Sequence, residues 1–175
     1  KAHKNDPKPP APRYADIAPE QFGLTPMIEA LPTPMERHQD IARVYQAQLG
    51  EVPVYLVDSA KYFGRQTMNG HLDDAERFIF FCRAALEALR RPELDWRPDI
   101  IHCHDWQTGL VPVLLFEQYA HAGMHWQRVC YTIHNFKHQG LTGEYALWAT
   151  GLTNIAHYFN YDRLRDNHNH TAVNL

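Results

Sequence analysis

Two apolar segments of the chain each run into a cluster of polar and aromatic residues. Residues 98–101 lead into residues 102–109, HCHDWQTG, and the second such segment is residues 129–135, VCYTIHN. An apolar, helix-like stretch separates them, from about Thr108 to Ala122. Strand, helix and strand make one βαβ unit, whose strands run parallel with a right-handed crossover. The sequence therefore predicts an α/β fold with an open parallel sheet and flanking helices, and both clusters lie at its ligand-binding carboxyl edge.

Composition narrows the possible functions. At 175 residues the chain is roughly one domain long. A net charge of −3 gives no indication of the basic surface with which proteins bind nucleic acids or membranes. The sequence contains no apolar stretch of about 18 residues, the length needed to span a bilayer. The three cysteines, Cys82, Cys103 and Cys130, lie in apolar segments, and their odd number predicts buried free thiols in a reducing cytoplasm.

The start of the chain differs from the rest in its proline content. Eight of the twelve prolines precede residue 37, and proline disrupts both helices and central strands. We therefore expect residues 1–36 to be an extended or disordered arm and residues 37–175 to be an incomplete domain. Because the chain starts at Lys1 rather than Met and stops without an obvious terminating signal, we expect it to be a piece of something longer.

Apolar spacing predicts the remaining elements. It indicates helices over about residues 34–50, 73–89 and 143–150, and a buried strand over residues 52–57. Asp73 and Glu76 are spaced as in a capping box, which predicts the start of the second helix.

His102, His104 and Asp105 are candidate metal ligands. Two histidines in an H-x-H pair at a strand end, beside a carboxylate, suit a hydrolytic metal site. Alternate residues of a strand share a face, so His102 lies one layer deeper than His104. We favour the interpretation of His102 as a hydrogen-bonded core histidine. Further ligands would have to come from His134 and His138.

Four residues at the two strand ends are candidates for sugar binding. Asp105 either caps the following helix or accepts hydrogen bonds from ligand hydroxyls. Trp106 offers a flat apolar wall, which suits the C–H face of a sugar. A neutral His134 can hydrogen-bond a substrate hydroxyl or stabilise developing positive charge. The alternative is that His134 and Asn135 simply form a surface turn.

Other chemistries find little support. Ser59, the only serine, lacks a nucleophile-elbow motif around it. The chain contains neither a G-x-G-x-x-G nor a G-x-x-x-x-G-K-[ST] motif. A nucleotide phosphate would therefore lack its usual glycine-rich cradle within this chain.

The two clusters resemble motifs of the bacterial glycogen synthase and plant starch synthase family. Residues 98–110, PDIIHCHDWQTGL, look like that family's PD-hydrophobic-H-x-HDW-x-x-G-L segment. Residues 131–140, YTIHNFKHQG, look like its T-hydrophobic-HN…QG segment, and residues 73–86 are similar to the preceding helix. The resemblance covers about residues 50–165.

This resemblance implies that the chain is part of the amino-terminal, Rossmann-like domain of a retaining GT-B glucosyltransferase. Such enzymes transfer glucose from ADP-glucose or UDP-glucose to the non-reducing end of an α-1,4-glucan, without a metal ion or other cofactor. The resemblance further implies that His134 stabilises the transition state at the transferring glucose. Asp105, Trp106 and Asn135 are expected to bind substrate.

Two parts of the family pattern are missing from these residues. They are the amino-terminal K-x-G-G loop and the second domain, whose cations neutralise the departing diphosphate. We therefore expect the isolated chain to be inactive and its missing partner to be the second domain. Two alternatives stay open: a non-catalytic glucan-binding or scaffold remnant, and a metal-dependent hydrolase that uses His102, His104 and Asp105.

Overall fold

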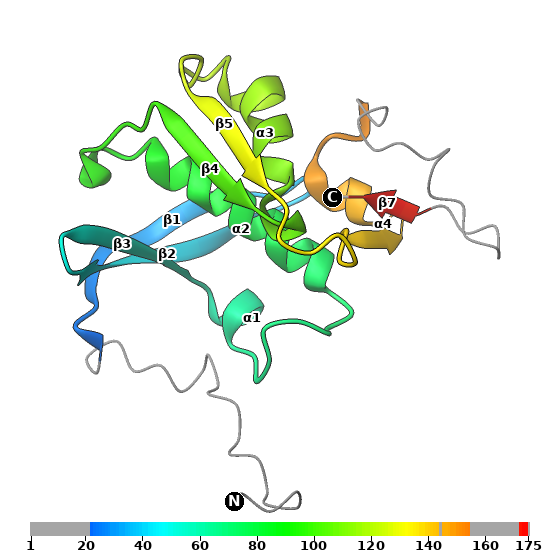
Figure 1. The fold of residues 1–175 in the computed structure, drawn as a ribbon, viewed down its shortest axis with the longest axis horizontal. Helices are drawn as coiled ribbons and strands as arrows, with labels where there is room; N and C mark the ends of the chain where they lie inside the picture. Colours follow the sequence, from blue (N-terminus) through cyan, green and yellow to red (C-terminus); the bar gives the residue numbers. More distant parts are fainter. Residues whose placement is uncertain (1–21, 144, 155–171, 175) are drawn as a thin grey trace, which may run out of the picture.

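The computed structural model describes residues 22–143, 145–154 and 172–174 (Figure 1). Within them a long helix, α2, lies between a three-stranded antiparallel sheet, β1-β2-β3, and a two-stranded parallel sheet, β4-β5. A third, small antiparallel sheet pairs β6 with β7 beside helix α4. The fold is mixed α/β with a parallel sheet and flanking helices, as the sequence predicts.

The elements have the following bounds. The strands are β1 Thr25–Pro34, β2 Gln39–Leu49, β3 Val52–Asp58, β4 Ile100–His104, β5 Arg128–Thr132, β6 Leu141–Gly143 and β7 Ala172–Asn174. The α-helices are α1 Ala60–Phe63, α2 Asp74–Leu89, α3 Leu110–Leu114 and α4 Tyr145–Thr150. Short 3₁₀ turns cover Pro92–Leu94 and Trp106–Thr108, and one π turn covers Leu115–Tyr119.

The predicted βαβ unit is confirmed. Strands β4 and β5 pair in parallel, with Ile100 opposite Arg128 and His104 opposite Thr132. The helix predicted between them is present as three successive segments, the Trp106–Thr108 turn, α3 and the π turn. The helix predicted over residues 143–150 is also confirmed, as α4.

The helix predicted over residues 34–50 is wrong, because most of this segment is strand β2. Ala42 and Val44 are buried while Ile41 is exposed, so burial follows the two-residue period of a strand. Pairing on both sides, with β1 and with β3, overrides the helical spacing of the apolar residues.

The arm predicted over residues 1–36 overlaps β1. Residues 1–21 of that arm lie outside the described residues. Residues 25–34 are extended, but they pair with β2 and bury Ile28 and Leu31 in the core. Prolines are tolerated here because β1 is an edge strand, where a missing backbone N–H costs no ladder bond. This part of the segment therefore belongs to the folded body.

Strand β3 is present but less buried than predicted. Among the described strands it pairs with β2 alone, and it leaves Val52 and Leu56 exposed at the other edge of the sheet. The cysteine prediction is also corrected in part. All three thiols are free, and Cys82 and Cys103 are buried, but Cys130 is exposed.

Helix α2 begins where the sequence predicts, but the predicted capping box is wrong. The Asp73 carboxylate accepts a hydrogen bond from Arg65 instead of capping the helix. The Asp74 carboxylate accepts from the backbone N–H groups of Gly70 and His71, at 2.7 and 3.2 Å. The loop before the helix is therefore fixed by the first residue of the helix itself.

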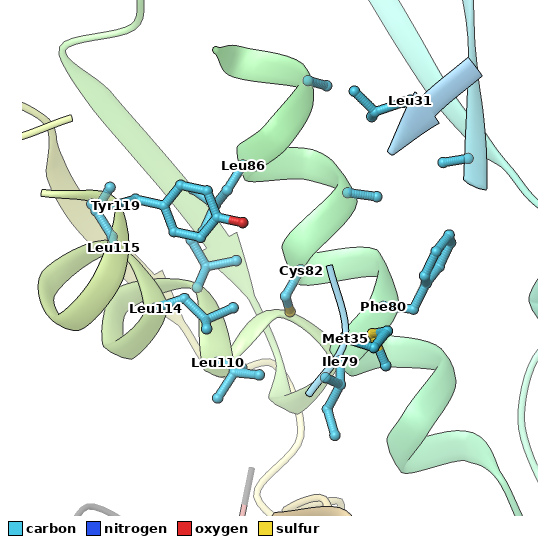
Figure 2. Packing of buried hydrophobic residues seen from close by; sticks show 14 of the residues in the cluster. Leu31, Met35, Ile79, Phe80, Cys82, Leu86, Leu110, Leu114, Leu115 and Tyr119 are labelled. Carbon is cyan, nitrogen blue, oxygen red and sulfur yellow. The ribbon is translucent and has the colours of Figure 1, made fainter. Parts of the chain in front are cut away.

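The hydrophobic core forms on both sides of α2 (Figure 2). On one side Phe80 and Ile79 pack near Leu31 and Met35, from β1 and the loop after it. On the other side Cys82 and Leu86 face α3 and the π turn, which contribute Leu110, Leu114, Leu115 and Tyr119. Among the described residues, no helix is long and apolar enough to cross a membrane.

A polar cluster around Asp40 ties the antiparallel sheet to the helices. Its Oδ2 atom lies 2.8 Å from His38 Nε2, 2.8 Å from Lys61 Nζ and 2.5 Å from the Tyr62 hydroxyl. The same hydroxyl lies 3.0 Å from a carboxylate oxygen of Glu76 on α2. Burial alone would raise the pKa of Asp40. The three hydrogen bonds, with that from Lys61 first, outweigh burial and lower the pKa from 3.8 to about 2.

This lowered pKa predicts an acid-sensitive contribution to stability. A folded-state pKa below the unfolded value stabilises the protein above about pH 4, and the contribution is lost as the pH falls towards 2. The shift corresponds to about 2 kcal/mol. In urea titrations between pH 2 and 6, Asp40→Asn should remove this component of the unfolding free energy. Glu51→Gln, an exposed change in the β2–β3 turn, is the charge-matched control, and an equal pH response in both variants would contradict the prediction.

Candidate functional site

The turn after β4 is held in an uncommon backbone conformation. Asp105 has a φ of 56° and a ψ of 178°, a left-handed φ that residues other than glycine rarely adopt. The Thr108 hydroxyl accepts from the backbone N–H of His104 at 2.7 Å and lies 2.8 Å from its carbonyl oxygen. The backbone N–H of Asp105 donates to the Thr132 carbonyl at 2.9 Å. The turn is therefore fixed both to itself and to β5.

The carboxylate of Asp105 joins the two sequence motifs. Its Oδ1 atom accepts a hydrogen bond from the backbone N–H of His134 at 2.7 Å. It makes no side-chain hydrogen bond to the following turn. The capping interpretation of Asp105 is therefore wrong, and this oxygen instead fixes the start of the loop after β5.

Three histidine side chains form a row beside this turn. His102 Nε2 lies 2.8 Å from the Thr132 hydroxyl, and His104 Nδ1 lies 2.9 Å from His134 Nε2. The ring centroids of His102 and His104 are 4.2 Å apart, and those of His104 and His134 are 5.2 Å apart. All three side chains are exposed. The row brings side chains from both strand ends into direct contact.

The interpretation of His102 as a core histidine is wrong. The alternation of the strand is as predicted, but the buried face is the one that carries Cys103, which is only 2% exposed. His102 and His104 lie on the opposite face of β4. Burial raises the pKa of the Cys103 thiol, so this cysteine does not supply a thiolate beside the site.

The predicted metal-ligand set does not assemble. In the part of the chain that the structure describes, no three His, Cys, Asp or Glu side chains come together in an arrangement that could hold a metal ion. One ring nitrogen of each of the three histidines contacts Thr132 or another histidine, and an oxygen of Asp105 contacts the His134 backbone. The metal-hydrolase alternative therefore has no site among the described residues.

Trp106 follows Asp105 in the same turn. Its ring packs edge-on against Phe78 of α2, with centroids 5.0 Å apart and planes at 81°. Gly140, with a φ of +64°, also lies against this side chain, where an added Cβ would stand 2.6 Å from ring atom Cε3. The half-buried Trp106 also lines a pocket of about 470 Å³, together with residues 137–142 and Tyr145. Its predicted role as a wall is thus compatible with its position.

Asn135 is placed in the turn that follows His134. Its Oδ1 atom accepts from the backbone N–H of Lys137 at 3.0 Å, which is the local turn that the sequence left open as an alternative. The structure therefore brings Asp105 and His134 together and places Trp106 in the wall of a neighbouring pocket. The side-chain oxygen of Asn135 is engaged in a hydrogen bond within its own loop. Their roles toward substrate remain predictions.

Sequence reasoning missed several residues of this edge. Thr108 clamps the turn, Gly140 supports Trp106, and the partner of His104 is His134 rather than a metal ion. One signal was available for the last contact. In a parallel register that pairs His104 with Thr132, His134 follows two residues beyond the paired position.

Comparisons with known proteins agree with the two motifs. Residues 4–175 match the family of starch synthase catalytic domains. The chain is 61% identical over 117 residues to probable glycogen synthase 2 of Synechocystis sp., a match that covers 67% of this chain and 23% of the relative. It is 63% identical over 114 residues to glycogen synthase 1 of a Synechococcus strain, covering 65% and 23%. The chain thus spans about a quarter of the length of these relatives.

A solved structure is similar over most of the chain. The catalytic domain of starch synthase IV from Arabidopsis thaliana, bound to ADP and acarbose, superposes with a TM-score of 0.73 at 33% sequence identity. The match covers 86% of this chain and 31% of that one.

The contact between Gly140 and Trp106 generates a prediction on stability. Gly140→Ala strains a left-handed backbone and also drives a methyl group into the indole ring. Gly50→Ala, at a φ of +63° with nothing within 4 Å of the added Cβ, strains the backbone alone. We expect Gly140→Ala to lower the unfolding free energy by about 1–3 kcal/mol more than Gly50→Ala, measured by urea titration. Equal losses would show that the indole contact contributes nothing.

Proposed function

Because the chain belongs to the family of starch synthase catalytic domains, we propose that it is part of a glycosyltransferase that elongates an α-glucan. One observation carries the proposal beyond family membership. The two family motifs converge at one sheet edge, where Asp105 of the first holds the backbone of His134 in the second. His134 thereby presents an exposed imidazole at the carboxyl ends of parallel strands, where α/β folds bind ligands.

The proposed donor is ADP-glucose or UDP-glucose, and the proposed acceptor is the non-reducing end of an α-1,4-glucan, with retention of configuration. The starch synthase IV catalytic domain is bound to ADP and acarbose, which supports a nucleotide-sugar donor and a glucan acceptor for this protein. Trp106 and the adjacent pocket offer an aromatic wall with polar neighbours, a combination that suits a sugar. No metal ion or other cofactor is part of the proposal.

The proposed role of His134 is electrostatic. A glucosyl transfer with retention of configuration passes through a transition state in which positive charge develops on the sugar. A neutral imidazole that is already oriented stabilises such charge without reorganising during the reaction. Asp105 acts on the same reaction by fixing the backbone of His134, and its carboxylate can also bind sugar hydroxyls.

The remaining elements of the reaction lie outside this chain in our proposal. The cations that neutralise the departing diphosphate belong to a second domain, so the isolated chain is inactive. We also propose that the protein acts in the cytoplasm, a reducing compartment in which its three free cysteines would stay reduced.

His134→Ala tests the proposed role in the complete protein that contains this chain. We expect turnover with ADP-glucose or UDP-glucose and a maltooligosaccharide to fall by a factor of about 10² or more, because a preorganised electrostatic group is lost. The thermal midpoint should change little, because the side chain is exposed. His121→Ala, at another exposed histidine, is the control. Normal turnover in His134→Ala would refute the role.

A second test compares the isolated chain with the complete protein. We expect the complete protein to incorporate glucose into glycogen from radiolabelled ADP-glucose or UDP-glucose, and the isolated chain to incorporate none. The folded state of the isolated chain is checked by circular dichroism. Transfer by the folded chain would contradict the proposal that a second domain supplies essential cations.

A further inference from the structure

The contact between His104 and His134 constrains where protons sit. The two facing nitrogens, His104 Nδ1 and His134 Nε2, are 2.9 Å apart. A hydrogen bond between two neutral imidazoles needs one N–H and one lone pair, so a single proton lies between the rings. The protonation state of the outer nitrogen of His134, Nδ1, is then set by which ring donates.

The two possible directions have opposite consequences at the sugar. If His104 donates, neutral His134 carries its proton on Nδ1 and presents a donor. If His134 donates from Nε2, its Nδ1 presents a lone pair. Only the second arrangement lets His134 stabilise developing positive charge. It also places both rings in the Nε2–H form, which is the form that neutral histidine side chains favour in water.

The surroundings of the pair favour a fixed arrangement. The backbone of His104 is held by the Thr108 hydroxyl on both its N–H and its carbonyl oxygen. The backbone N–H of His134 is held by Asp105 at 2.7 Å. Within the described part of the chain, His134 Nδ1 makes no hydrogen bond and is available to a ligand. The ring of His134 is thus fixed at one nitrogen and open at the other.

We propose that His104 is a positioning residue, which accepts the Nε2–H of His134 and so keeps the His134 Nδ1 lone pair facing the transferring sugar. This inference rests on the function proposed above for His134. His104 itself makes no contact with substrate in the proposal. It acts through the tautomer and the ring orientation of its neighbour, in the way that an outer-shell partner orients a histidine ligand.

The kinetic test separates a hydrogen bond from a packing role. His104→Asn keeps an acceptor near the position of Nδ1, whereas His104→Leu fills similar space without one. In the complete protein we expect His104→Leu to lower kcat by a factor of about 10–100 with little change in KM for the nucleotide sugar. His104→Asn should retain most of the wild-type kcat. The matched control is His121→Leu, the same substitution at an exposed histidine outside the row of three.

Two kinetic outcomes would overturn the proposal. One is wild-type turnover in His104→Leu. The other is a loss in His104→Asn as large as that in His104→Leu, which would mean that the hydrogen bond is not what matters.

A spectroscopic test does not depend on activity. In the complete wild-type protein labelled with ¹⁵N-histidine, the imidazole nitrogen shifts of His134 should report a protonated Nε2 and an unprotonated Nδ1. A protonated Nδ1 would overturn the proposal even if the His104 variants fold poorly. The proposed function would be refuted by a different result, normal turnover in His134→Ala. That result would not affect the tautomer measured for His134 in the wild-type protein.

Discussion

The parallel pairing of β4 with β5 is the constraint on which the site depends. It places His104 opposite Thr132, so that both strands end at the same edge. The backbone bond from Asp105 to Thr132 extends the ladder by one residue beyond the strands. From there a side chain continues the connection, since the Asp105 carboxylate reaches the backbone of His134. Residues about 30 positions apart in the chain thereby share one small region of space.

The body of the fold supports this edge from behind. Helix α2 buries one side against the antiparallel sheet and the other against α3, so the parallel pair is backed by a packed layer (Figure 2). The same helix supplies Phe78, whose ring packs roughly perpendicular to that of Trp106. The position of the Trp106 ring is thus set by the core helix as well as by the turn that carries it.

The sequence predicted the parts of the fold that local patterns determine. The βαβ unit, α2 and α4 were found from apolar runs and their polar ends. Strand β2 was not predicted, because the spacing of its apolar residues also fits a helix. Pairing with β1 and β3 decides between helix and strand here. The prediction that His102 is buried was wrong for a related reason. Alternation says that His102 and Cys103 face opposite ways, but which face is buried depends on where the helices pack.

The loop of the second motif, residues 134–140, is attached at both ends to the end of β4 and the turn that follows it. His134 is bound at its start by Asp105 and His104, and Gly140 rests on Trp106 at its end. The arc between these two anchors is itself held, since the backbone N–H of His138 donates to the Asn135 carbonyl and Gln139 Nε2 donates to the Phe136 carbonyl. Such a clamped arc has little conformational entropy left to lose, so a ligand arriving at this edge would meet a frame whose shape is already set.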